Sequence, residues 1–409
     1  MWTFGNTCLV RIGDRVFASG TETLAGVPPL NNVRWVLYER QTNGWKEHAK
    51  GFGRTREPCP LACFSDKRLL LSDNPTLTGP EARDGPARPE IVEWNTRAST
   101  FTGQILRPEW AGEPPFTEHS YRSFAADGSN RELILFHNVG YTHAEWTFCD
   151  RTNRWSAQGR LDWPWGGEYP TPRPIRVCYP SVALRDRKVY FLGVSDIPEP
   201  YPEWQAYKKT LTGKEWDYDF RRLFFSWSDD IATGKFHDWI EVASRDKTCG
   251  WIRPCDLAVG ADGAVHLLWQ ERAIDLRLRE KFFPDETQSV TLNYGLFRDG
   301  QVRARQVLHR SEDRLNEETV QWGRLHQTPD GRFLVIYTTT GTEWKGHAVE
   351  ILPDGSPGPA IQFDLKNRFV HFYTATTHAG CEPSWLIDLY GVCAGQDNRM
   401  CYSCLRVDR

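Results

Sequence analysis

Two histidines and a tyrosine stand beside apolar segments in the second quarter of the chain. His119 precedes the segment SFAAD, His143 follows ELILFHNV, and Tyr179 opens the segment YPSVAL. An imidazole changes its charge near neutral pH, and a phenol carries a proton that it can share. We therefore interpret His119, His143 and Tyr179 as candidate catalytic residues for general acid–base chemistry.

Cationic and polar side chains near these three residues are candidates for substrate binding. Tyr121 and Arg122 follow His119, and Arg176 precedes Tyr179. Arginine presents a planar fork of donors that matches a carboxylate, so these positions suit an acidic substrate. The predicted binding set is completed by Arg56, Arg253 and Asp256.

A glycoside hydrolase would instead use two carboxylates about 5 to 10 Å apart. Carboxylates at comparable positions are Glu118, Glu145, Asp196, Asp256 and Glu271. The residues alone do not decide between a reaction that uses a histidine and a tyrosine as acid and base and a hydrolysis that uses two carboxylates.

The segments that carry these residues belong to a repeated unit. Each unit has a short apolar strand, a turn containing Asp or Gly, and a second apolar strand, as in YRSFAADGSNRELILFHN. The Asp-Gly pairs at 127, 262 and 330 predict tight turns between the two strands. Seven units begin near residues 5, 56, 117, 175, 250, 320 and 370.

The spacing of the units leaves room for about four strands in each, and this predicts an all-β fold. A single four-stranded sheet cannot bury both of its faces, whereas sheets stacked around an axis can. We predict one domain over residues 1–409, a seven-bladed β-propeller with four-stranded antiparallel blades. A pair of β-sandwiches is the alternative. Within a hairpin the outer ends of the two strands lie together, so His119 and His143 should share one rim.

Two insertions interrupt the repeat, in units four and five. The first is DIPEPYPEWQAYKKTLTGKEWDYDFRR, and the second is RAIDLRLREKFFPDETQ, in which IDLRLREKFF predicts a short helix. Long insertions on a rigid scaffold often carry binding residues. The segment EWDYDFRR would either cover the central funnel or pack against the side of the propeller, and we favour packing.

Composition narrows the class of protein. The charge is nearly balanced, with 50 Lys and Arg against 53 Asp and Glu, so neither a nucleic-acid partner nor a membrane partner is expected. No apolar run is long enough for a transmembrane helix, and no signal peptide is seen, so we expect a cytoplasmic protein unless a secreted chain has been trimmed. The oligomeric state is not predicted.

The eleven cysteines are scattered singly, which fits a reduced protein better than a disulfide framework. Cys401 and Cys404 resemble half of a zinc site, but on a strand their odd spacing points the thiols to opposite faces. The two histidines lack an evident third ligand. We therefore expect no cofactor, with a metal at either place as the alternative.

Aromatic residues are abundant, with 18 Trp, 14 Tyr and 21 Phe. Most of them should fill the space between packed sheets. Those exposed in loops would offer flat apolar faces to sugar rings, so a carbohydrate is the expected substrate.

The motifs themselves resemble a known family. EHSYRSFAADG, LILFHNVGYTH and CYPSVAL are similar to segments of the sialidase-like propellers, related to BNR-repeat proteins, that include the ulvan lyases and rhamnosyl-glucuronate lyases. In those enzymes a His before the first inner strand, a His after the next strand and a Tyr-Pro in the following blade form the active site. The likeness covers about residues 115–200 at the level of motifs. It implies a polysaccharide lyase with His119, His143 and Tyr179 in its active site.

Such a lyase would remove the C5 proton of a uronic acid and expel the oxygen on C4. The developing enolate requires a cation at the carboxylate. The lyases carry an arginine late in the strand after Tyr-Pro, but this chain has FLGVSDI there. Arg122, Arg176 or Arg253 is predicted to replace that arginine.

Two further departures keep other functions open. The histidines are 24 residues apart, with extra length in the turn DGSNRE, and the sialidase Asp box is absent. The alternatives are a glycoside hydrolase of rhamnosidase or sialidase type and a non-catalytic propeller that binds glycan or protein.

Overall fold

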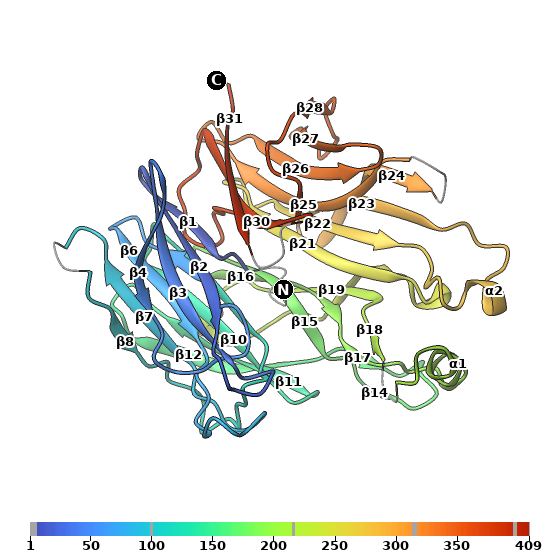
Figure 1. Ribbon diagram of the computed structural model, residues 1–409, viewed down its shortest axis with the longest axis horizontal. Helices are drawn as coiled ribbons and strands as arrows, with labels where there is room; N and C mark the ends of the chain where they lie inside the picture. Colours follow the sequence, from blue (N-terminus) through green and yellow to red (C-terminus); the bar gives the residue numbers. More distant parts are fainter. Residues whose placement is uncertain (1–5, 99–100, 215–216, 313–316, 396–398, 409) are drawn as a thin grey trace.

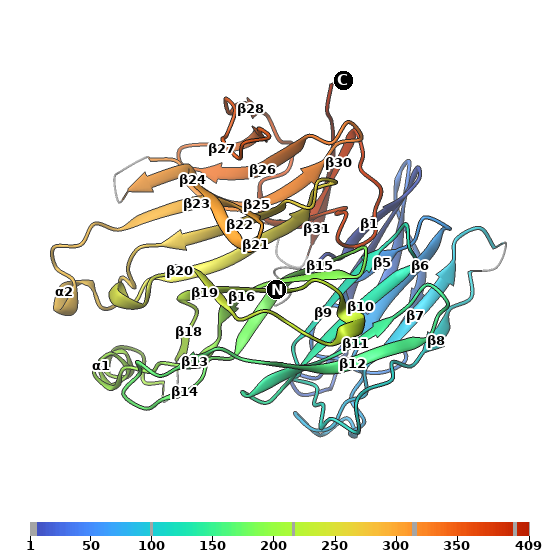
Figure 2. The ribbon, with the colours of Figure 1, turned by 180° about the vertical axis from the view of Figure 1, so that it is seen from behind.

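The computed structural model describes residues 6–98, 101–214, 217–312, 317–395 and 399–408. Seven antiparallel sheets follow one another in sequence order around a common centre, so the chain forms a seven-bladed β-propeller (Figures 1 and 2). The predicted fold is confirmed. Among the described residues, no helix has the length and apolar character needed to cross a membrane.

The first three blades each contain four strands in the order of the sequence. Blade 1 comprises β1 (Leu9–Ile12), β2 (Arg15–Thr23), β3 (Val33–Gln41) and β4 (Gly44–Lys50). Blade 2 comprises β5 (Leu61–Cys63), β6 (Arg68–Asp73), β7 (Glu90–Asn95) and β8 (Gln104–Leu106). Blade 3 comprises β9 (Arg122–Asp127), β10 (Glu132–Val139), β11 (His143–Cys149) and β12 (Trp155–Asp162).

The next three blades have the same order and carry the insertions. Blade 4 comprises β15 (Val177–Arg185), β16 (Lys188–Ser195), β19 (Arg222–Ser228) and β20 (Ile240–Ser244). Blade 5 comprises β21 (Trp251–Val259), β22 (Val265–Arg272), β23 (Ser289–Arg298) and β24 (Gln301–Glu312). Blade 6 comprises β25 (Thr319–Gln327), β26 (Phe333–Thr340), β27 (Trp344–Ile351) and β28 (Ile361–Phe363).

The described part of blade 7 has three strands, which fits the degenerate seventh repeat. They are β29 (Phe369–Thr374), β30 (Leu386–Cys393) and β31 (Met400–Arg406). The ring closes where blade 7 meets blade 1. Arg11 makes two bonds of 2.7 Å to the buried Asp388 carboxylate, and the Thr7 hydroxyl donates to the Thr374 carbonyl.

Short elements lie between or beside the blade strands. Two-stranded ribbons are formed by β13 (Trp165–Gly166) with β14 (Arg173–Pro174), and by β17 (Ile197–Pro198) with β18 (Tyr218–Asp219). Helix α1 spans Pro202–Thr212 and helix α2 spans Arg279–Phe282, while 3-10 turns cover Ile231–Thr233 and Asp246–Thr248. Helix α2 confirms the short helix that was predicted in the fifth unit.

The inner strands are apolar because neighbouring blades cover both of their faces. Every residue of β9 is buried, and so are all residues of β10 except the last. Outer strands such as β24 alternate between exposed and half-buried residues. Trp94, Trp146 and Trp322 are fully buried in the layers between sheets, where most of the aromatic residues were expected.

The inner hairpin turns lie at one end of the propeller, and two glycines meet there. A Cβ atom on Gly128 would lie 2.1 Å from the Gly380 carbonyl oxygen, so only glycine fits at this contact. The opposite end is formed by the beginnings of the first strands and the ends of the second strands, and we call it the upper rim. His119 and Tyr179 lie at this rim.

Candidate functional site

A chain of hydrogen bonds joins three ring side chains at the upper rim. The Tyr179 hydroxyl donates to the Tyr121 hydroxyl over 3.0 Å, and the Tyr121 hydroxyl lies 3.1 Å from His119 Nε2. Because Tyr121 accepts the Tyr179 hydrogen, its own hydrogen is available to the imidazole. His119 and Tyr179, which were predicted to be catalytic, are thus connected through Tyr121.

The backbone at Tyr179 places its ring in this chain. Its φ angle is 51°, in the left-handed region that residues other than glycine rarely adopt. The pairing of β15 with β16 shifts its register between Cys178 and Ser181, as in a β-bulge. The Tyr179 ring centroid lies 5.0 Å from that of Tyr121. The irregular strand therefore directs the phenol toward blade 3.

Burial sets the protonation of all three groups. Burial, followed by repulsion from Arg56 and Arg176, lowers the pKa of His119 to about 4. Burial raises the pKa of Tyr121 and of Tyr179, and the Asp196 carboxylate adds to both shifts. At neutral pH the imidazole is therefore an uncharged proton acceptor and both phenols keep their protons. His119 is half-buried whereas the two phenols are buried, so a ligand reaches His119 first.

Arg176 supports the site rather than facing solvent. Its Nη2 lies 2.8 Å from the Asp196 carboxylate, and both side chains are buried. Its guanidinium also covers the Tyr141 ring at 3.9 Å and the Tyr121 ring at 5.4 Å. The structure therefore places Arg176 beside the predicted site with its charge already compensated.

Arg56 is the more accessible cation beside His119. Its Nη1 lies 3.5 Å from Glu118 and its Nε lies 3.5 Å from Glu57, and both separations are long for ion pairs. Arg122 is buried below it and donates to the carbonyl oxygens of Glu57 and Pro58. Of these two predicted binding residues, Arg56 has the position from which a ligand is within reach.

His143 shares the rim, as predicted, but belongs to the third strand of its blade. Val139 at the end of β10 pairs with His143 at the start of β11, so the imidazole lies outward from the inner strand. Its Nδ1 lies 2.7 Å from the Thr142 hydroxyl and its Nε2 lies 3.0 Å from Glu145. Both ring nitrogens therefore have local partners, and the catalytic role of His143 stays a prediction.

Asp256 and Arg253 follow one another closely in β21 but have different surroundings. The Asp256 carboxylate is buried, accepts from the backbone N–H groups of Leu257 and Leu325, and lies 3.2 Å from Arg324. That arrangement joins two blades internally and keeps Asp256 away from the rim. Arg253 is half-buried, 4.3 Å from the Trp251 ring centroid and 5.3 Å from that of Trp322.

The carboxylates considered for hydrolysis all have cationic or hydrogen-bonding partners. Glu118 accepts from the Gly85 N–H, and Glu145 contacts His143. Glu271 lies 2.5 Å from Arg245 and accepts from the Trp269 indole over 2.6 Å. Asp196 and Asp256 are bound to arginines as described above.

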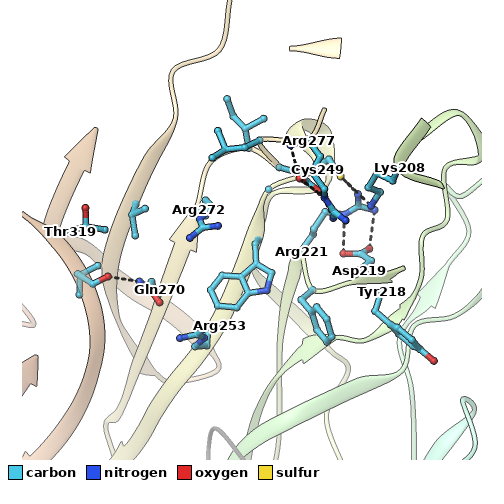
Figure 3. Close-up of a pocket in the computed structure, with 18 of the residues that line it drawn as sticks. Lys208, Tyr218, Asp219, Arg221, Cys249, Arg253, Gln270, Arg272, Arg277 and Thr319 are labelled. Atoms are coloured by element: carbon cyan, nitrogen blue, oxygen red, sulfur yellow. Dashed lines mark hydrogen bonds and ion pairs between the residues drawn. The ribbon is translucent and has the colours of Figure 1, made fainter. Parts of the chain in front are cut away.

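A cavity of about 540 Å³ opens next to this site and is lined by the insertion of blade 4 and by residues of blades 5, 6 and 7 (Figure 3). Phe220 lines it and lies 5.9 Å from the Tyr179 ring, and Tyr218 lines it while its hydroxyl is 2.7 Å from that of Tyr141. The two sites therefore adjoin. Both insertions contribute to the cavity wall, the first through α1 and β18 and the second through Ile274, Asp275, Leu276 and Arg277.

Aromatic contacts hold the two insertions against each other. The Trp204 ring of α1 lies 5.6 Å from that of Phe283, and the Tyr207 ring lies 5.6 Å from that of Phe282 in α2. The segment containing EWDYDFRR was favoured to pack against the side of the propeller. Its described residues Tyr218 to Arg221 instead line the cavity at the upper rim.

Four residues that line this cavity were not predicted from the sequence, namely Trp251, Arg272, Arg221 and Lys208. The position of Arg272 in the repeat could have predicted its place. It ends the second strand of a unit, and that end lies at the same rim as the start of the first strand. Arg221 and Lys208 lie in an insertion, where no repeat position indicates direction.

Among the described residues, no three His, Cys, Asp or Glu side chains are grouped to hold an ion. Cys401 is buried and Cys404 is exposed, as the alternation along a strand predicts.

Comparison of the sequence with protein-family models and with curated proteins finds no match. Solved structures do match. An ulvan lyase of polysaccharide lyase family PL25, bound to -[GlcA(1-4)Rha3S]-, has a TM-score of 0.54 at 9% identity, over 99% of this chain and 95% of that one. The polysaccharide lyase Uly1 has a TM-score of 0.53 at 12% identity, over 98% and 90%.

The lectin BP39L from Burkholderia pseudomallei is equally similar, with a TM-score of 0.53 at 9% identity over 98% of this chain and 96% of that one. At such identities the likeness concerns the fold. The resemblance to the ulvan lyase propellers that the motifs suggested is thus confirmed as a shared propeller fold.

Proposed function

We propose that this protein is a carbohydrate-active enzyme that cleaves a uronic-acid-containing glycan by β-elimination. The observation that carries the proposal is the hydrogen-bonded chain from Tyr179 through Tyr121 to His119 at the upper rim. It holds a neutral base and a protonated acid side by side. The shared fold with an ulvan lyase bound to an oligosaccharide supports the choice of substrate class.

In the proposed reaction, each proton that leaves one group of the hydrogen-bonded side chains or the substrate is taken up by another. When the substrate binds, the Tyr121 hydroxyl turns its hydrogen from His119 Nε2 to the oxygen on C4, which frees Nε2. His119 Nε2 then takes the proton from C5, and the electrons of the C5–H bond form the C4–C5 double bond. The C4–O bond breaks, and the leaving oxygen takes a proton from the Tyr121 hydroxyl. The imidazolium then returns a proton to Tyr121 across their 3.1 Å contact, which restores both groups.

Tyr179 acts as a positioning residue in this scheme. By donating to Tyr121, it orients the remaining Tyr121 hydrogen away from itself. The strained backbone at Tyr179 keeps the donor in place before substrate arrives.

Arg56 is the proposed partner of the substrate carboxylate. It lies near enough to His119 to lower the pKa of the imidazole, and its ion pairs to Glu57 and Glu118 are long. A cation at the carboxylate stabilises the enolate that forms when C5 loses its proton. Arg176 is less suited because Asp196 already compensates its charge.

A glycan-binding propeller without catalysis is the second candidate. The similarity to the lectin BP39L and the burial of both phenols favour it. It differs from the lyase in one measurable respect, since it would bind the oligosaccharide and leave it intact.

The experiment incubates the protein with an oligosaccharide of the repeat GlcA(1-4)Rha3S and follows the ultraviolet absorbance of the unsaturated uronate. Tyr121→Phe should reduce the rate about 10²- to 10⁴-fold, because it removes one hydroxyl and little else. Tyr190→Phe, a buried tyrosine at an internal position of β16, is the matched control and should keep its rate. New reducing ends without the absorbance would indicate hydrolysis, and binding without either product would indicate the lectin.

A further inference from the structure

The cavity beside the proposed catalytic chain contains two arginines on one face of a single sheet. Trp251 pairs with Arg272 and Arg253 pairs with Gln270 across β21 and β22. Directly paired residues, and residues two apart on one strand, point to the same face of a sheet. Trp251, Arg253, Gln270 and Arg272 therefore form a group that lines the cavity together, as Figure 3 shows for the last three.

Three cations on the side of the cavity formed by the insertions are bound to carboxylates. Arg221 lies 3.0 Å from Glu199 and 2.8 Å from Asp219. Lys208 lies 2.6 Å from Glu199, and Arg277 lies 2.6 Å from Asp275. These contacts compensate the positive charge on the side of the cavity formed by the insertions.

Arg272 differs from these cations. It is exposed at the end of β22, and in the part of the chain that the structure describes no carboxylate is paired with it. Its neighbour Arg253 is close enough that the two guanidinium groups repel one another. Burial, and to a smaller extent this repulsion, lowers the pKa of Arg253 to about 10.

An aromatic surface lies beside the two guanidinium groups. Trp251 is half-buried at the start of β21, and the guanidinium of Arg253 is stacked on its ring. A half-buried indole offers an apolar face to the C–H groups of a sugar ring, while guanidinium groups suit oxyanions. Together these groups match a sugar that carries a negative substituent.

We propose that Trp251, Arg253 and Arg272 form a subsite for a second acidic sugar of the glycan, one that carries a carboxylate or a sulfate ester. The inference rests on the proposed function, because Phe220 and Tyr218 connect this subsite to the catalytic chain. It extends that function by requiring a substrate with negative charges on at least two sugar units.

The test measures binding by calorimetry, in a His119→Ala background that prevents turnover. The probes are a tetrasaccharide of the repeat GlcA(1-4)Rha3S, its desulfated form and its carboxyl-reduced form. Arg272→Gln should weaken binding of the tetrasaccharide about ten- to a hundred-fold, because a charge-assisted hydrogen bond is lost. If Arg272→Gln no longer weakens binding of the desulfated probe, Arg272 binds the sulfate. If it no longer weakens binding of the carboxyl-reduced probe, Arg272 binds the carboxylate.

The matched control is Arg298→Gln, which removes an arginine from the opposite end of the same blade, where it pairs with Asp262. An equal loss of affinity in both variants, or unchanged affinity in Arg272→Gln, would overturn the subsite. If the proposed function is wrong but the subsite is right, the result differs. The protein with its native His119 then forms no product, while binding of the tetrasaccharide still depends on Arg272.

Discussion

The two sides of the cavity use the same kind of residue in opposite ways. On the side of blade 4 and its insertion, Arg221 and Lys208 are buried among carboxylates. On the side of blade 5, the guanidinium of Arg253 lies over the Trp251 ring, and Arg272 is exposed where it lines the cavity. The carboxylates of the first side are Glu199, Asp217, Asp219 and Asp246.

Compensation of charge, more than the number of cations, separates a structural cluster from a binding site in this cavity. Taking a charge out of water is costly, and a buried partner offsets that cost. The guanidinium of Arg221 is already paired with neighbouring carboxylates, so few of its N–H groups are available to a ligand. Arg272 has that capacity because it is exposed and its close neighbour is another cation.

The largest expected effect comes from breaking the compensated side. Arg221→Met would leave Glu199 and Asp219 buried without their main cation, and should lower the free energy of unfolding by about 3–5 kcal/mol. Urea denaturation at neutral pH measures it. The control is Arg277→Met, at a more exposed cation of the same cavity, with an expected loss of about 1 kcal/mol or less. If both variants lose the same free energy of unfolding, the buried ion pairs of Arg221 contribute no more to stability than the exposed ones of Arg277, which would contradict the prediction.

A second prediction concerns Glu57, a buried acid whose two carboxylate oxygens accept no hydrogen bond in the described structure. Burial raises its pKa to about 7, against the opposing attraction of Arg122 and Arg56. The folded state therefore binds its proton more tightly than the unfolded state. Its contribution to stability is fully present below the pKa of the unfolded chain and is lost as pH rises through about 7.

Glu57→Gln removes this titration. Between about pH 4 and pH 8, the free energy of unfolding of the native protein should fall by about 3 kcal/mol relative to that of the variant. This is the free-energy equivalent of the shift in the pKa of Glu57. Denaturation curves of both proteins across that range provide the measurement. A difference that stays constant with pH would mean that folding leaves the pKa of Glu57 unchanged, so that Arg56 and Arg122 offset the effect of burial.

Much of the fold was predictable because it depends on local patterns. The Asp-Gly turns at 127, 262 and 330 each join the first two strands of a blade, and the apolar character of β9 and β10 follows from cover on both faces. Antiparallel pairing also brought His119 and His143 to the same rim. Each of these features requires only neighbouring segments of the chain.

The partners of the site residues were not predictable in the same way. Arg176 and Asp256 were expected to bind substrate, but whether their charge is compensated depends on Asp196, which follows β16 in the same blade as Arg176, and on Arg324 in another blade than Asp256. The cavity likewise needs three blades and two insertions to exist. A repeat indicates which rim a side chain occupies, whereas the pairing of buried charges depends on how individual side chains meet, within one blade for Arg176 and between two blades for Asp256.

The smallest expected effect on stability is at Arg272, on the uncompensated side of the cavity. Arg272→Met removes an exposed cation with no carboxylate partner among the described residues, so no buried charge is left alone. The free energy of unfolding should change by no more than about 0.5 kcal/mol. Removal of the charge also relieves its repulsion of Arg253, so any change should favour folding. Urea denaturation beside Arg221→Met tests this directly. A loss of several kcal/mol would mean that Arg272 belongs to the structure of the blade, whereas unchanged folding together with weakened glycan binding would mean that the cation serves the ligand.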